Sequence, residues 1–273
     1  MSDDVFLKPG NRTPLIFAAI AVVAAGLSGW FYWHSHNAAL PTIPVSAPPE
    51  PDARVPEARI EHPVPAAPDD AAKESLPELN DSDKAIADAL GSAAAGLPLP
   101  QYLVPESVIR HIVVTVDNLP RQKIAVDRRP VVPAAGAFIA EGDELHATLD
   151  SRNFQRYEPM VELIRNADMR KFAGVYLRFY PLFQKAYQDL GYPTGYFNDR
   201  LVKVIDMLLA TPQIAAPIDL VRPNVMYVYA DPKVESLPAG QKLLIRMGTD
   251  NAAVVKAKLM ELRAIITVAG PKH

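Results

Sequence analysis

The chain of 273 residues contains no cysteine. A disulfide framework, a thiolate nucleophile and cysteine-ligated zinc or iron–sulfur sites are therefore excluded. The sequence also lacks Gly-x-Ser-x-Gly, a glycine-rich phosphate loop, His-Glu-x-x-His and a calcium-loop pattern. No histidine pair has metal-ligand spacing on a predicted helix. We therefore predict no catalytic residue, no cofactor and no metal site, which favours a role other than catalysis.

An excess of positive charge is missing as well. The chain has 28 basic and 31 acidic residues, which gives a formal net charge of -3. Proteins that bind nucleic acid use clustered positive charge to neutralise phosphates. We therefore expect no nucleic-acid partner.

One long apolar run is present, near the N-terminus. The stretch from Leu15 to Trp33 has no ionisable residue and ends in four consecutive aromatic residues. As a helix it would span about 28 Å, close to the roughly 30 Å of a bilayer's hydrocarbon core. This predicts a single transmembrane helix. A cleaved signal peptide is the alternative, because it too has a basic start followed by an apolar run.

The charges around this helix predict its orientation. Lys8 and Arg12 precede it, and the next basic residue is Arg54. Since basic residues close to a spanning helix mark its cytoplasmic side, we place residues 1–14 in the cytoplasm and the bulk of the chain outside it.

Small residues recur every four positions in the same helix, at Ala21, Ala25 and Gly29. Such a stripe lets a second helix approach closely, which would allow a homodimer. The alternative is that small residues are simply common in membrane helices.

Composition divides the remainder of the chain. Prolines are frequent from Pro41 to Pro68, and no aromatic residue occurs from His34 to Gln101. A segment of this kind cannot bury enough apolar surface to offset its chain entropy. We predict a disordered, proline-rich tether over residues 34–75, one domain over 76–267, and a flexible tail over 268–273.

Apolar spacing predicts that this domain is mainly α, with a minor β-hairpin or ribbon. Predicted helices cover residues 80–95, 105–118, 169–190, 198–211, 241–247 and 251–267. A further helical region begins at Ser151 or Asn153, and Pro159 marks either a break in it or a fresh first turn. The hairpin is expected over 138–149, and a short strand over 225–229 could pair with it. Residues 112–116 could instead be a strand, because all five are β-branched. Pro181 should kink its helix or divide it into two.

The densest block of aromatic and polar residues lies around the end of the predicted helix 169–190 and the start of the next. Tyrosine and arginine are effective binding anchors, so we treat this block as a candidate binding groove. It consists of Arg178, Tyr180, Tyr192, Tyr196, Asn198, Asp199 and Arg200. In the alternative interpretation the tyrosines pack in the core, Asn198 or Asp199 caps a helix, and the arginines pair with carboxylates.

Several motifs in this region form a recognisable set. They are Val-Asp-Asn-Leu-Pro at 116–120, Arg-Phe-Tyr-Pro-Leu-Phe-Gln at 178–184, Gly-Tyr-Pro at 191–193, Tyr-Phe-Asn-Asp-Arg-Leu-Val at 196–202, Leu-Leu-Ala-Thr-Pro at 208–212 and Gly-Gln-Lys-Leu-Leu at 240–244. With them the chain resembles the bacterial domain-of-unknown-function family numbered three thousand and fourteen. The resemblance implies a membrane-anchored envelope protein, and it implies no activity and no functional residues.

Together these observations predict a single-pass protein of the bacterial inner membrane. Its N-terminus would be cytoplasmic, and its helical periplasmic domain would bind a protein or an envelope polymer. A periplasmic hydrolase or transferase is one alternative, with Asp199, Arg178 and Glu144 as the nearest candidates. Glu144 belongs to an acidic turn with Glu141 and Asp143, which is also typical of a plain soluble turn. A dimeric membrane sensor is the other alternative.

Overall fold

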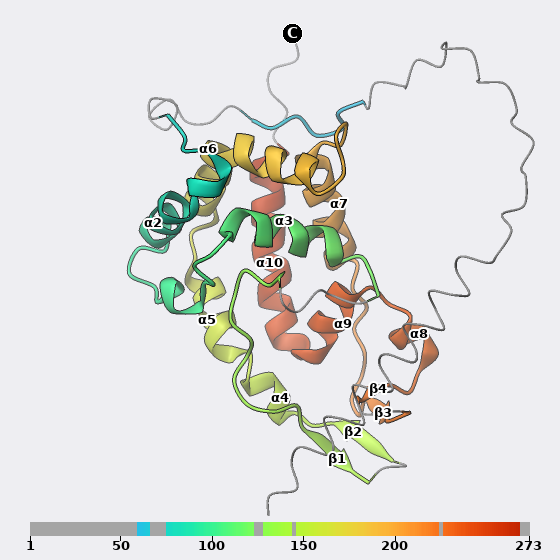
Figure 1. Ribbon diagram of the computed structural model, residues 1–273. Coiled ribbons are helices and arrows are strands. Elements are labelled where there is room, and N and C mark those ends of the chain that lie inside the picture. Colours follow the sequence, from blue (N-terminus) through green and yellow to red (C-terminus); the bar gives the residue numbers. More distant parts are fainter. Residues whose placement is uncertain (1–58, 66–74, 123–127, 144–145, 224–225, 268–273) are drawn as a thin grey trace, which may run out of the picture. The chain divides into compact units, whose positions relative to one another are not determined.

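The computed structural model describes residues 59–65, 75–122, 128–143, 146–223 and 226–267 (Figure 1). The predicted transmembrane helix with its small-residue stripe, residues 1–14 and the tail 268–273 lie outside these ranges. No helix within the described ranges is both long and apolar enough to cross a bilayer. Contacts divide the chain into residues 1–53 and 54–273, and all described residues belong to the second unit.

Helices make up most of the described chain, which confirms the mainly α prediction (Figure 1). In chain order they are η1 (Leu79–Asp81), α2 (Asp83–Ala93), η2 (Leu99–Tyr102), α3 (Val108–Asn118), α4 (Arg152–Gln155), α5 (Glu158–Asn166), α6 (Met169–Asp189), α7 (Phe197–Leu209), α8 (Pro232–Glu235), α9 (Ala239–Arg246) and α10 (Thr249–Ile266).

The core is built around α6. Phe179 and Phe183 lie on the face of α6 that the three-and-four spacing predicts, and both are buried against α2 and α3. Phe197, the first residue of α7, joins the same cluster, and its ring stacks on Phe183 at a centroid distance of 5.8 Å. The far side of α7 packs on α9 and α10. The start of α7 is therefore held between α6 and the C-terminal helix.

A small antiparallel sheet contains β1 (Ala140–Gly142), β2 (Ala147–Leu149), β3 (Asp219–Val221) and β4 (Val228–Tyr229), paired in that order. The first two strands are the predicted hairpin, with Ala140 opposite Leu149. Within the predicted strand 225–229, Val228 and Tyr229 form β4, and Val225 lies outside the described residues. β4 pairs with β3, a strand that was not predicted, and β3 in turn pairs with β2 of the hairpin. Leu149, Leu220 and Tyr229 form a second apolar cluster with residues from α8 and α9.

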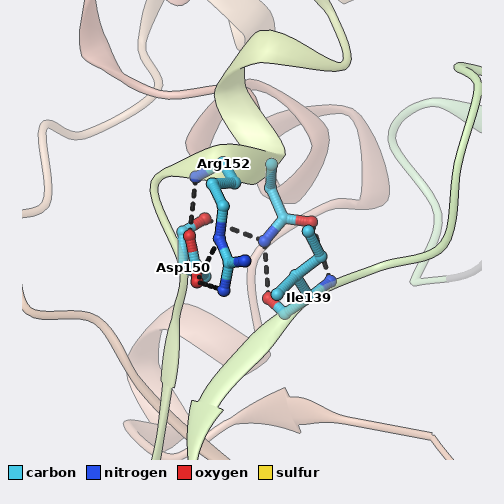
Figure 2. A network of polar contacts seen from close by, with 4 residues as sticks. Ile139, Asp150 and Arg152 are labelled. Carbon is cyan, nitrogen blue, oxygen red and sulfur yellow. Dashed lines mark hydrogen bonds and ion pairs between the residues drawn. The ribbon is translucent and has the colours of Figure 1, made fainter.

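A polar network fastens this sheet to α4 (Figure 2). The buried amide of Asn153 donates to the carbonyl oxygens of Ile139, at 2.6 Å, and Asp150, at 2.8 Å. Its own oxygen accepts the N–H of Ile139 at 3.0 Å. The Arg152 side chain donates hydrogen bonds to the Asp150 carboxylate, and this lowers the pKa of Asp150. Every polar group of the buried amide is thereby satisfied.

The expectation that Pro181 divides its helix is wrong, since α6 runs without interruption from Met169 to Asp189. Proline removes one helical hydrogen bond, here the bond to the carbonyl of Leu177. Pro181 is exposed, so that carbonyl lies on the solvent side of the helix, while the opposite face stays packed.

The strand alternative for residues 112–116 is also wrong, because they lie within α3. Helical spacing places Ile109 and Val113 of α3 together against α6, and this burial outweighs the β-propensity of the run. The predicted helix 80–95 begins only at Asp83, and neither Asn80 nor Asp81 caps it.

Candidate functional site

The first turn of α7 is capped from another helix. Neither Asn198 nor Asp199 caps it, contrary to the sequence-based alternative, because the helix already begins at Phe197. The side-chain oxygen of Gln184, on α6, accepts the N–H of Phe197 at 2.9 Å, and its nitrogen donates to the carbonyl of Gly195 at 2.7 Å. With the cap supplied by Gln184, the side chains of Asn198 and Asp199 are available for other contacts.

Asp199 uses both carboxylate oxygens to hold the chain's own residues 59–65, which we call the docked segment. The N–H groups of Glu61 and His62 donate to this carboxylate at 3.1 and 2.6 Å. Figure 1 shows the segment in blue, beside α6 and α7. These seven residues fall inside the tether 34–75 that the sequence analysis predicted to be disordered, so that prediction does not describe this stretch.

Three further contacts complete the docking. The hydroxyl of Tyr196 accepts the N–H of Val64 at 3.0 Å, and the amide of Asn198 donates to the carbonyl of His62 at 2.9 Å. Lys203 forms an ion pair with Glu61 at 2.9 Å. We call Tyr196, Asn198, Asp199 and Lys203 the segment-binding surface. Four of its five contacts are to main-chain groups, so recognition depends mainly on the peptide backbone.

Buried aromatic residues support this surface from behind. The hydroxyl of Tyr176 donates to the side-chain oxygen of the fully buried Asn198 at 2.9 Å, and the Asn198 amide also donates to the carbonyl of Ile266 in α10 at 3.1 Å. The Tyr180 ring lies 5.7 Å from that of Tyr196, and burial raises the pKa of both Tyr176 and Tyr180. Both hydroxyls therefore remain protonated donors. The Tyr176 hydroxyl orients the Asn198 amide, whereas the Tyr180 hydroxyl donates to the side-chain oxygen of Gln184 at 3.0 Å.

Other members of the candidate groove turn toward α3 instead. Arg200 forms an ion pair at 3.0 Å with Asp117, whose side chain is 2% exposed, and Arg121 pairs with the same carboxylate at 2.5 Å. The Tyr192 ring stacks on Tyr187 at 4.6 Å. We call Asp117, Arg121 and Arg200 the buried ion cluster. The alternative sequence interpretation, with paired arginines and packed tyrosines, describes this half of the block.

The structure therefore separates the predicted groove into two parts. Tyr180, Tyr196, Asn198 and Asp199 lie at or directly behind the docked segment, while Tyr192 and Arg200 belong to the α3 side. Arg178 lies elsewhere on α6, with its guanidinium carbon 5.3 Å from the ring centroid of Phe179. Lys203 and Glu61 were not predicted, because no local pattern links residues that lie 142 positions apart in the chain.

The other carboxylates considered from sequence do not join this site. Glu141 lies in β1, Asp143 accepts the N–H of His146 at 2.8 Å, and Glu144 is outside the described residues. No three histidine or acidic side chains in the described part of the chain gather as metal ligands. A cavity of about 430 Å³ opens between the loop 211–218 and helices α9 and α10, and no candidate groove residue lines it.

These features define the class: a mainly helical domain with a small sheet and a surface that holds a peptide segment. The family described as "Protein of unknown function (DUF3014)" matches residues 108–263, more than half of the chain, and the protein belongs to this family. The match confirms the resemblance found in the motifs. It contains the whole segment-binding surface and leaves out the docked segment. Comparison with curated proteins found no match, and neither did comparison with solved structures.

Proposed function

We propose that this protein is a single-pass module of the bacterial inner membrane whose periplasmic domain binds a peptide segment of another protein. The observation that carries the proposal is the set of four hydrogen bonds between the segment-binding surface and the main chain of residues 61–64. Main-chain groups are common to all polypeptides, and capture of a peptide backbone is a recurrent mode of protein recognition. A protein partner therefore suits this surface better than a polysaccharide polymer.

The proposed location depends on the N-terminal sequence. The apolar run from Leu15 to Trp33 would anchor the protein, and Lys8 with Arg12 would keep residues 1–14 in the cytoplasm. The proline-rich tether would place the domain away from the membrane surface. Dimerisation through Ala21, Ala25 and Gly29, the basis of the sensor alternative, stays a prediction about the membrane segment.

Binding also accounts for Asp199 better than hydrolysis does. A general acid or base must present a free oxygen to the reacting group. Here each oxygen of Asp199 accepts an N–H group, from Glu61 and from His62. The carboxylate thus acts as a receptor for peptide N–H groups.

Photocrosslinking in living cells tests this function. A photoreactive amino acid at position 203 lies beside the docked segment, and one at position 84, on α2, is the control. Both native lysines are exposed, with side chains 57% and 87% accessible. We expect a discrete protein adduct from position 203 that is missing from position 84, identified by mass spectrometry. Identical adducts at both positions, or none at 203 beyond the chain's own segment, would contradict the proposal.

A further inference from the structure

We infer that the docked segment is an internal competitor, and that the partner peptide carries the same pattern: an acidic residue, any residue, proline, and a residue with a free N–H. This inference rests on the proposed function and names its ligand class. The pattern is that of Glu61, His62, Pro63 and Val64, placed against Lys203, Asp199 and Tyr196.

The acidic position follows from charge. Asp199 is negative, and it accepts the two main-chain N–H groups at the first and second positions. The Glu61 side chain is directed to Lys203 instead, and this contact lowers the pKa of Glu61. A basic residue in place of Glu61 would face Lys203 with like charge. The surface therefore selects an acid at the first position.

The proline position follows from the donors. Pro63 has no N–H, and the surface contacts the N–H groups of the residues on either side of it, His62 and Val64, so proline at this position leaves no donor unsatisfied. Proline also restricts the free peptide, which reduces the entropy lost on docking. The N–H of the next residue, Val64, donates a hydrogen bond to the hydroxyl oxygen of Tyr196 at 3.0 Å.

The docked segment is held in a way that allows replacement. None of residues 59–65 is buried, and none belongs to the hydrophobic clusters of the described domain. By contrast Leu79, the first helical residue after it, is buried in the main cluster. Polar contacts at a partly exposed surface can be exchanged for contacts with another peptide at little net cost.

Covalent linkage makes this competition strong. A segment tethered to its own binding site competes at an effective concentration on the order of millimolar. Release of the segment should therefore raise the apparent affinity for an external peptide by at least about tenfold.

The test uses the full chain in lipid nanodiscs and a fluorescent peptide that copies residues 58–66. Its affinity, measured by anisotropy, is compared between the native chain and a tether variant with E61K and V64P. These substitutions remove the ion pair and one donor of the docked segment and leave the helical domain unchanged. We expect at least about tenfold tighter binding to the tether variant. Adding D199A should abolish that binding, whereas the matched control D250A, in the exposed first turn of α10, should not.

The peptide variants test the pattern. A peptide with Glu61→Lys should bind the tether variant about threefold more weakly than the native peptide, because its ion pair with Lys203 is exposed. A peptide with Val64→Pro should bind about tenfold more weakly, because it leaves the Tyr196 hydroxyl without its donor. If the native chain and the tether variant bound the fluorescent peptide with equal affinity, the docked segment would not be a competitor. Equal affinity for all peptides would overturn the pattern. The proposed function would survive both results, since its own test is the adduct from position 203, whereas failure of every peptide to bind would overturn the inference alone.

Discussion

Asp117 and Asp199 are two carboxylates near the start of α7, and their partners differ in origin. Asp117 is buried and paired with Arg121 and Arg200, which belong to the helical domain. Asp199 is partly exposed and accepts N–H groups from Glu61 and His62, more than 130 positions earlier in the chain. Both residues are aspartates, so residue type does not distinguish them. The burial of each carboxylate and the origin of its partners show that Asp117 stabilises the domain, whereas Asp199 holds the docked segment.

Replacing Asp117 with asparagine should have the largest effect. The change leaves two guanidinium groups beside a buried neutral amide, and breaking buried pairs costs about 3–5 kcal/mol. Because Arg121 and Arg200 are partly exposed, we expect a loss of about 2–3 kcal/mol in the free energy of unfolding. Urea unfolding followed by circular dichroism measures it, with Asp250→Asn as an exposed control. A loss equal to that of the control would make the buried ion cluster dispensable.

Gly195→Ala should disturb both the packing of Tyr192 near Asp117 and the position of Tyr196 beside the docked segment. A methyl group on this residue would lie 2.8 Å from a ring carbon of Tyr187 and 2.9 Å from the Cβ of Tyr192. Relief of such overlap costs about 1–3 kcal/mol, and the shift would also move Tyr196. Gly174→Ala is the matched control, since nothing lies within 4 Å of its added methyl group. Thermal unfolding should show a lower midpoint for the first variant only; equal midpoints would mean that the loop adjusts freely.

Asp199→Asn should release the docked segment and leave the domain intact. The amide keeps the shape of the carboxylate but loses the charge that strengthens both hydrogen bonds. We expect hydrogen exchange at the Glu61 and His62 amides to rise about tenfold, with global stability unchanged within about 0.5 kcal/mol. Unchanged exchange at these two amides would show that Asp199 does not hold the segment.

Acid should weaken the docking slightly. Lys203 lowers the pKa of Glu61 from its ordinary value of 4.5. Since the pKa is lower in the docked state, this contribution is present above about pH 4.5 and is lost as the pH falls through the docked value. A dye attached through Ile60→Cys, the single thiol in the chain, reports docking. The acid transition should shrink in Glu61→Gln, and an identical transition would remove Glu61 as its cause.

Much of the fold could be predicted from the chain. The apolar spacing of α6, α7 and α10 and the short apolar pieces on either side of the acidic turn in the hairpin β1–β2 are local patterns, and the three helices and the hairpin form where expected. Prediction failed where packing outweighed a local preference. Pro181 does not divide α6 because its broken bond faces solvent, and α3 is helical although its residues are mostly β-branched. The strand β4 was expected from the alternation over 225–229, whereas β3 is only three residues long and has too short a pattern to be recognised.

The candidate site was predicted in part. Tyrosine, asparagine and acidic side chains around residue 196 pointed to a binding surface, and Tyr196, Asn198 and Asp199 contact the docked segment. The same local pattern included Tyr192 and Arg200, which face α3, because sequence does not show which side of a helix start each residue occupies. Lys203 was missed because its partner lies in a tether that composition alone describes as unstructured.

The sequence by itself determined the mainly α class, the hairpin, the lack of cysteine chemistry and the family, since each depends on composition or on short-range spacing. Only the tertiary structure decided the roles of the polar residues at α7. Gln184 caps the helix although it lies 13 positions before Phe197. The carbonyl of Asp117 accepts a hydrogen bond from Arg200, 83 positions later in the chain, and the carboxylate of Asp199 accepts one from the N–H of Glu61, 138 positions earlier. Such contacts form only when packing brings distant parts of the chain together, and no local sequence pattern specifies which distant residue becomes the partner.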